Sequence, residues 1–168
     1  MDKPLVNRVA NSSLKTINLE DFFPSREIVP FDLKDYLFME MIIKEKDFRL
    51  ALKEHDWSQY EGKILVVFCS ADAIVPSWAY MLVASHAAPV AEEVFMGTKD
   101  AYLSHYYTQK IRSLDTKDYE DQRIVVKGCS KKPVPTSAYF ELTSKLTPIS
   151  KSIMYGEPCS TVPIYKKR

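Results

Sequence analysis

Glycine is scarce in this sequence, with only 4 among 168 residues. Nucleotide-binding loops need several glycines at fixed spacing, and neither a G-x-G-x-x-G fingerprint nor a phosphate-binding loop is present. The excess of charge is also small, because 23 basic residues oppose 22 acidic ones and leave a net charge of +1. No overall field therefore favours nucleic acid as a partner. The 3 cysteines are too few, and odd in number, for a disulfide framework.

Targeting signals and long apolar runs are missing as well. The N-terminal region has no apolar core of signal-peptide length, and Pro76 divides the weakly charged stretch 64–90. We therefore expect a cytoplasmic protein with reduced thiols and no membrane as a partner. What is present is an ordinary globular composition, 46% hydrophobic and 27% charged. Its length predicts a single domain over residues 1–168.

The hydrophobic pattern of residues 61–168 predicts an α/β core. Strands are predicted at 64–68, 90–96, 124–127 and 152–155. Helices are predicted at 76–87, 99–114 and 135–150. The β-α-β-α-β-α-β order favours a mainly parallel central sheet with flanking helices, in three layers. Residues 1–60 are predicted to add an N-terminal extension, with strands at 14–19 and 27–33. Residues 34–55 are predicted to form one long helix, or two helices with a break near residues 44–47. Pro30 favours an edge position for the second of these strands.

Two distant segments of the sequence repeat one pattern. Each has an apolar strand, a Cys-Ser step, a short loop and a V-P-[ST]-x-A-Y helix start. The first segment runs from Ile64 to Tyr80 and the second from Ile124 to Tyr139. A third Cys-Ser step, at Cys159, follows the last predicted strand. Every cysteine of the chain therefore follows a predicted strand and precedes a serine.

This placement predicts a thiol-lined site. The carboxyl ends of parallel strands lie at one edge of a sheet, where ligands bind in open α/β folds. Cys69, Cys129 and Cys159 are therefore expected to converge. Three thiolates suit zinc or an iron–sulfur cluster, and Asp72 or Glu157 is the candidate fourth ligand. The residues expected to line the site are Ser70, Ser130, Ser160, Tyr80, Tyr139 and Lys131.

Two other interpretations stay open. Cys129 lies beside Lys131 and Lys132, and because positive charge lowers the pKa of a thiol, it is a candidate reactive group of an enzyme. Free cysteine is also commonly buried as a small hydrophobic residue. In that case the protein is a non-catalytic interaction domain with structural cysteines. The sequence leaves open whether the protein is a monomer or a symmetric homodimer.

The chain resembles a bacterial family known as domain of unknown function 2480 over nearly its whole length. The segments that carry the resemblance include KEKDFRLALKEHDWSQYEGK, CSADAIVPSWAYML, KGCSKKPVPTSAYFELT and SIMYGEPCSTVPIYKK. The three Cys-Ser steps are its most specific part. The family has no established activity, but its genes are often found near those of iron–sulfur cluster assembly. The resemblance therefore implies a link to metal or sulfur handling, with iron–sulfur assembly proteins as partners and a role as an accessory factor.

Overall fold

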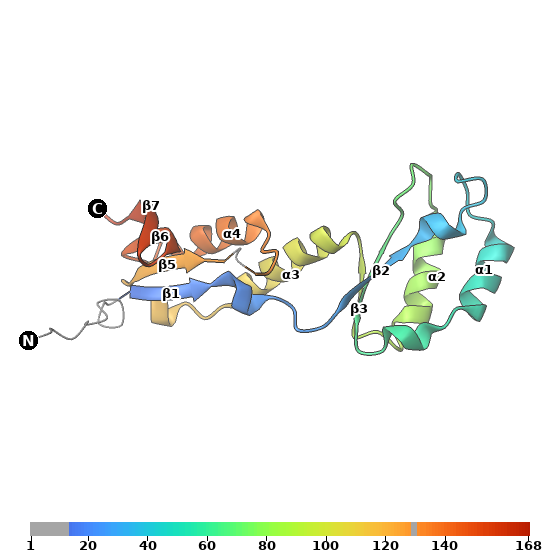
Figure 1. Ribbon diagram of the computed structural model, residues 1–168, viewed down its shortest axis with the longest axis horizontal. Helices are drawn as coiled ribbons and strands as arrows, with labels where there is room; N and C mark the ends of the chain where they lie inside the picture. Colours follow the sequence, from blue (N-terminus) through green and yellow to red (C-terminus); the bar gives the residue numbers. More distant parts are fainter. Residues whose placement is uncertain (1–13, 129–130) are drawn as a thin grey trace, which may run out of the picture. The chain divides into compact units, whose positions relative to one another are not determined.

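The chain forms two compact units that do not follow the order of the sequence. The computed structural model describes residues 14–128 and 131–168 (Figure 1). Unit 2 is the continuous segment Pro24–Leu103. Unit 1 consists of two segments, the residues up to Phe23 and Ser104–Arg168. The α/β class and the mainly parallel pairing predicted from the sequence are confirmed, but the strands are shared between two sheets. None of the helices in the described part of the chain has the length and apolar character that crossing a membrane requires.

Unit 2 contains a parallel three-stranded sheet. Its strands are β2 (Ile28–Asp32), β3 (Ile64–Phe68) and β4 (Glu93–Met96), in the order β2-β3-β4. β2 is an edge strand, as Pro30 indicated. The helices of unit 2 are α1 (Glu45–Glu54), α2 (Ser77–Ala87) and the first residues of α3 (Lys99–Ser113). Short 3-10 helices lie at Leu33–Tyr36 (η2) and Trp57–Tyr60 (η3).

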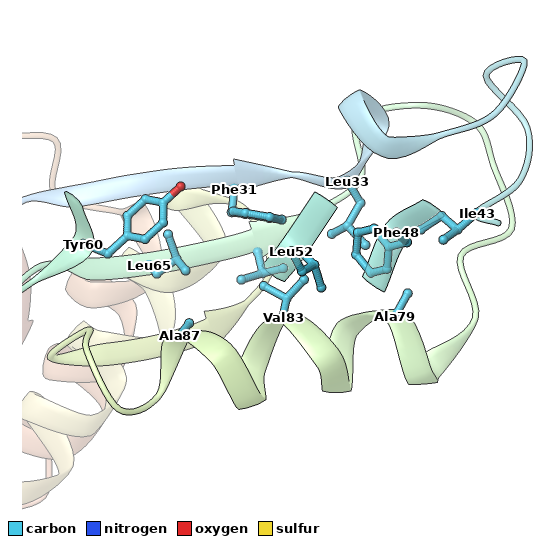
Figure 2. Close-up of a cluster of buried hydrophobic side chains, with 11 residues drawn as sticks. Phe31, Leu33, Ile43, Phe48, Leu52, Tyr60, Leu65, Ala79, Val83 and Ala87 are labelled. Carbon is cyan, nitrogen blue, oxygen red and sulfur yellow. The ribbon is translucent and has the colours of Figure 1, made fainter. Parts of the chain in front are cut away.

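Helices lie on both faces of the unit 2 sheet. Figure 2 shows the core on one face, where Ala79, Val83 and Ala87 of α2 lie against Leu52 of α1 and Leu65 of β3. Because side chains alternate along a strand, Val66 points to the other face.

On that other face Phe95, the partner of Val66 in β4, contacts the ring of Tyr102 in α3 at 5.4 Å between centroids. The Tyr102 hydroxyl also donates to the Glu93 carboxylate at 2.9 Å. The first residues of α3 therefore cover part of this second face, beside an open pocket of about 260 Å³ that Val66 and Lys99 help to line.

Unit 1 contains a mixed four-stranded sheet. Its strands are β1 (Leu14–Asn18), β5 (Arg123–Lys127), β6 (Ser152–Glu157) and β7 (Ser160–Lys166), in the order β1-β5-β6-β7. The first three are parallel, and β7 runs antiparallel to β6. Short 3-10 helices lie at Leu19–Phe22 (η1) and Lys117–Tyr119 (η4).

The hydrophobic core of unit 1 lies on one face of its sheet. Ile124, Val126 and Ile153 pack there against α4 (Thr136–Leu146) and against the later part of α3, which contributes Tyr107. The alternating residues of the same strands, such as Arg123 and Met154, point to the opposite face.

The two units repeat one local structure. In each, a strand, β3 or β5, is followed along the chain by a Cys-Ser step and then by an eleven-residue helix that starts after a proline, Pro76 or Pro135. The repeat also includes the first strand of each unit. Asn18 ends β1 and accepts a hydrogen bond from the Glu20 N–H, whereas Asp32 ends β2 and accepts one from the Lys34 N–H. The sequence echo is thus part of a structural duplication that also includes β1 and β2.

The segment predicted to be helical at 34–55 contains two helices, the end of η2 and α1, and the residues between them are not helical. α1 begins at Glu45, and a tight turn precedes it, in which Met39 and Glu40 have φ of 51° and 58°. The apolar residues before α1 are loop residues, and Phe38 and Ile42 bridge the two sides of the turn. Their helix-like spacing was misleading because the turn interrupts the backbone. The sequence pattern also gave no indication of β7.

Candidate functional site

The expected convergence of three cysteines on one sheet edge is wrong, because the strands that precede them belong to two sheets. Cys69 follows β3 in unit 2, and Cys159 lies between β6 and β7 in unit 1. Cys129 and Ser130 lie outside the described residues. Within residues 14–128 and 131–168, no three histidine, cysteine or acidic side chains are grouped to hold a metal ion. The role of the cysteines as zinc or cluster ligands stays a prediction without geometric support.

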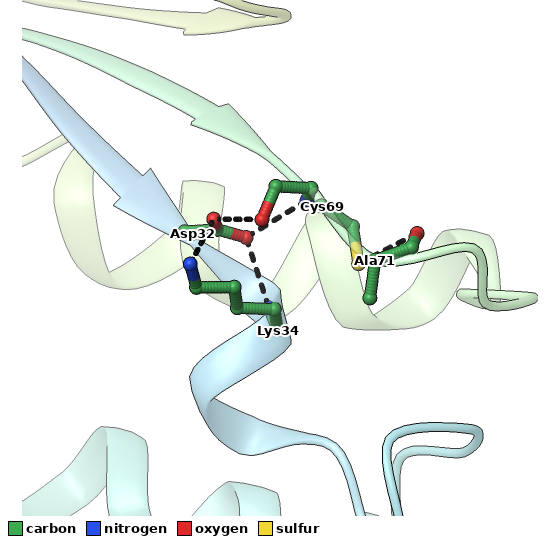
Figure 3. A network of polar contacts seen from close by, with 5 residues as sticks. Asp32, Lys34, Cys69 and Ala71 are labelled. Atoms are coloured by element: carbon green, nitrogen blue, oxygen red, sulfur yellow. Dashed lines mark hydrogen bonds and ion pairs between the residues drawn. The ribbon is translucent and has the colours of Figure 1, made fainter.

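A carboxylate holds the first Cys-Ser loop in place (Figure 3). The Oδ1 atom of Asp32 accepts hydrogen bonds from the backbone N–H groups of Ser70 and Lys34, both at 3.0 Å. Its Oδ2 atom accepts from the Ser70 hydroxyl at 2.5 Å and lies 3.8 Å from the Lys34 ammonium. Burial acts to raise the pKa of the Asp32 carboxyl, but these hydrogen bonds hold it below its ordinary value. Asp32 therefore fastens the loop after β3 to the end of β2.

Cys69 has a structural environment. The side chain is partly buried against the core of unit 2, and its thiol donates a weak hydrogen bond to the Ala71 carbonyl at 3.7 Å between Sγ and O. Burial, followed by the neighbouring Cys69 and Asp32 groups, raises the pKa of the Tyr80 hydroxyl. The predicted neighbours Ser70 and Tyr80 thus do lie near Cys69. Asp72, the candidate fourth ligand, is exposed.

Glu20 plays the corresponding part in unit 1. Its side chain is buried, and its Oε1 atom accepts a hydrogen bond from the Lys131 backbone N–H at 2.8 Å. The Lys132 ammonium lies 3.5 Å from the Glu20 carbonyl oxygen. The Tyr139 hydroxyl packs so closely on Gly128 that a Cβ there would lie 2.6 Å from it. Lys131 therefore contacts Glu20 through its backbone N–H and not through its side chain. A carboxylate thus binds the chain after β5, as Asp32 binds it after β3.

The third Cys-Ser step lies in the turn of the β6–β7 hairpin. Cys159 and Ser160 are both exposed. Glu157, the other candidate ligand, forms an ion pair with Lys127 at 3.2 Å. The backbone at Gly156 has φ of +117°, and a Cβ there would lie 2.7 Å from the Ser160 carbonyl oxygen. Glycine at this position is thus a requirement of the turn.

Sequence reasoning missed Asp32 and Glu20, the two residues that organise these loops. A signal was present, because Phe31-Asp32-Leu33-Lys34-Asp35-Tyr36 repeats the pattern of Ile17-Asn18-Leu19-Glu20-Asp21-Phe22. Both segments end a strand and begin a 3-10 helix. The carboxylates differ in position, since Asp32 belongs to the strand end and Glu20 to the 3-10 helix after it.

An open groove lies on the helix-bearing face of unit 1, between α4 and the β6–β7 hairpin. Its volume is about 450 Å³. The residues that line it are Val126, Thr136, Tyr139, Phe140, Thr143, Ile153, Met154, Tyr155 and Ile164. We call it the apolar groove, because none of its lining residues carries a charge. The ring of Tyr139 meets that of Tyr155 edge to face at 5.6 Å, which connects α4 to β6 along the wall of the groove.

These features define an α/β protein with an internal duplication, an open apolar groove, and two carboxylates, Asp32 and Glu20, that hold Ser70 and Lys131. A family described as Protein of unknown function (DUF2480) matches residues 3–167. The chain therefore belongs to the DUF2480 family, which confirms the resemblance seen in the sequence. No curated protein and no solved structure matches it.

Proposed function

We propose that this protein is a non-catalytic binding module that docks an apolar segment of a protein partner in the apolar groove of unit 1. The exposure of large apolar side chains around the groove supports this proposal. Phe140 on α4 is 75% exposed, Ile164 on β7 is 51% exposed and Tyr155 on β6 is 42% exposed. Adjacent exposed apolar groups of this size are typical of interaction sites.

The lining of the groove indicates the chemistry of its occupant. Its polar side-chain atoms are hydroxyl oxygens, from Thr136, Thr143, Tyr139 and Tyr155. A charged group would lose its hydration there without gaining an ion pair, which is costly. An aromatic or branched aliphatic side chain would instead gain from the burial of apolar surface. The volume of the groove falls within the usual range of ligand pockets.

Strand β7 borders the groove and forms one edge of the sheet. Pro163 cannot donate a main-chain hydrogen bond, and the pairing of β7 with β6 is irregular between Ile153 and Met154. Both features oppose the addition of a further strand at this edge. We therefore expect the partner to bind through side chains in the groove, and not through main-chain pairing with β7.

Selection of a displayed library of random peptides on the full-length protein tests the proposal. We expect the selected peptides to contain aromatic or branched aliphatic anchors. Because a central aromatic contact commonly contributes about 2 kcal/mol or more, the Phe140→Ser variant should bind these peptides at least about tenfold more weakly.

The chain offers a matched control for this variant. Met81 of α2 occupies the position in unit 2 that corresponds to Phe140, and it is exposed to a similar degree. Met81→Ser should bind the selected peptides like the wild type. Peptides without apolar anchors, or equal binding by Phe140→Ser, would contradict the proposal.

The zinc or iron–sulfur function, with iron–sulfur assembly proteins as partners, stays a prediction from the sequence and the resemblance. So does a reactive thiol at Cys129, which lies outside the described residues. Metal analysis and visible absorbance of anaerobically purified protein test the former. Absence of zinc and iron, with no uptake after reconstitution, would contradict it.

A further inference from the structure

A second groove lies at the amino ends of the parallel strands of the unit 1 sheet. Its volume is about 560 Å³. The residues that line it are Leu14, Arg123, Lys151, Ser152, Met154, Pro163, Tyr165, Lys166 and Lys167. Four of these nine residues are cations and none is acidic. We call it the basic groove.

The strand register explains how the basic groove forms. Leu14 of β1 pairs with Arg123 of β5, Arg123 pairs with Ser152 of β6, and Ser152 pairs with Lys166 of β7. These residues form one row across all four strands. At about 5 Å between strands, the row spans about 15 Å, the length of about four to five extended residues.

The cations of the basic groove have few anionic partners. Lys167 lies 3.6 Å from the Asp121 carboxylate. Within the described residues, Arg123, Lys151 and Lys166 form no ion pair. A chain with a net charge of only +1 thus gathers four positive side chains around one groove. Such a concentration of charge attracts an acidic ligand.

The apolar residues of the groove narrow the choice of ligand. Leu14, Met154, Pro163 and Tyr165 supply apolar surface beside the cations. Single-stranded nucleic acid binds on stacked aromatic side chains, and this groove offers one tyrosine. A flat anionic membrane would not fill a concave groove. A short peptide with alternating acidic and apolar residues satisfies both the cations and the apolar surface.

We propose that the basic groove binds an acidic peptide segment of a protein partner, with its carboxylates on Arg123, Lys151 and Lys166 and an apolar side chain against Met154 and Pro163. This site shares Met154 with the apolar groove, but none of its cations lines that groove. Binding in either groove can fail while binding in the other persists. The two inferences are therefore tested by different variants.

Fluorescence anisotropy with a rhodamine-labelled peptide of sequence EDLEDFED tests this proposal on the full chain. The peptide QNLQNFQN keeps the apolar residues and removes the charge. We expect EDLEDFED to bind and QNLQNFQN to bind at least about tenfold more weakly, with affinity falling as salt rises. The double variant Lys151→Glu/Lys166→Glu should lose at least about tenfold in affinity for EDLEDFED.

Three further variants make the test specific. Lys46→Glu/Lys53→Glu makes the same change in net charge on α1 of unit 2 and should not alter binding beyond about twofold. Asp121→Asn frees Lys167 from its carboxylate and should strengthen binding by up to about fivefold. Phe140→Ser should leave binding of EDLEDFED unchanged, which separates this site from the apolar groove.

Several outcomes would overturn the proposal. These are equal binding of QNLQNFQN, no binding of EDLEDFED, or no effect of the Lys151→Glu/Lys166→Glu variant. A single-stranded oligonucleotide or an anionic vesicle that binds more tightly than EDLEDFED, with the same dependence on Lys151 and Lys166, would replace the peptide as the ligand.

Discussion

Units 1 and 2 share a strand–loop–helix–strand arrangement and differ in the segment that comes after the third strand. After β4, Gly97 leads into α3, whose first turns cover part of the second face of the unit 2 sheet. After β6, a short turn leads into β7, which adds a fourth strand to the edge of the unit 1 sheet. The same framework thus places a helix on the second face of the sheet in unit 2 and a further strand at the edge of the sheet in unit 1. The comparison indicates that the segment after the third strand decides which of these two additions a unit receives.

The largest expected effect is on the covering of unit 2. Tyr102 is fully buried, contacts Phe95 and donates to Glu93. Tyr102→Ala should lower the free energy of unfolding by about 3–5 kcal/mol. Ile164→Ala in β7 removes a half-exposed side chain and should cost less than about 1.5 kcal/mol. Chemical denaturation of both variants measures these changes. Equal losses of unfolding free energy would show that α3 and β7 contribute equally to the stability of their units.

The next effect separates Asp32, which also holds the loop after β3, from Asn18, which mainly caps a 3-10 helix. Asp32→Ala removes an acceptor of three hydrogen bonds, two of them from Ser70, and should cost about 2–3 kcal/mol. Asn18→Ala, at the corresponding strand end of unit 1, removes mainly a helix cap and should cost about 1 kcal/mol. Unfolding in urea measures both. A smaller loss for Asp32→Ala than for Asn18→Ala would contradict the assigned role of Asp32.

The Asp32 carboxylate makes the stability of unit 2 depend on pH in the acidic range. The pKa of Asp32 is lowered in the folded state, so its stabilising contribution is fully present above the ordinary value of 3.8. That contribution is lost as the pH falls through the lower folded pKa. The difference in stability between wild type and Asp32→Asn should therefore shrink below pH 3.8. A constant difference across this range would show that the Asp32 charge is not involved.

His55 gives unit 2 a second pH dependence, at milder pH. Burial lowers the pKa of its imidazole below the ordinary 6.5, although Asp56 acts in the opposite direction. The ring stacks on Tyr60 and lies 2.9 Å from its hydroxyl. The folded state thus favours neutral His55, and unfolding becomes easier as the pH falls below 6.5. In thermal unfolding, His55→Gln should lose this dependence of stability on pH between about pH 7 and 5. An unchanged dependence would show that another group causes it.

The smallest effect concerns the thiols and leaves stability unchanged. Cys159 is exposed in a hairpin turn, whereas Cys69 is partly buried and donates to Ala71. Cys159 should therefore react faster than Cys69 with a disulfide reagent in the native protein. Mass spectrometry of partly labelled protein identifies the site, and Cys159→Ser should remove the fast phase. Faster labelling of Cys69 would indicate that its loop opens readily.

The sequence predicted local elements better than their assembly. The apolar run Ile64–Phe68 and the V-P-[ST]-x-A-Y helix starts identified β3, α2 and α4, because buried strands and proline-initiated helices have strong local signals. Nothing local indicates that β1 pairs with β5 while β2 pairs with β3. The expected thiol site depended on a single sheet edge and failed for that reason. The grooves were missed because β7, which carries Pro163 in its middle, was not predicted as a strand.

The nested order of the strands has a consequence for synthesis on the ribosome. Unit 2 is one continuous segment, so its strands and helices can assemble as soon as Leu103 has emerged. β1 is made first, but its partner β5 begins at Arg123, on the far side of that whole unit. The edge of β1 therefore remains without its partner for most of translation. Contacts this distant in sequence also form slowly, so unit 1 should be the last part of the chain to fold and the part most dependent on chaperones.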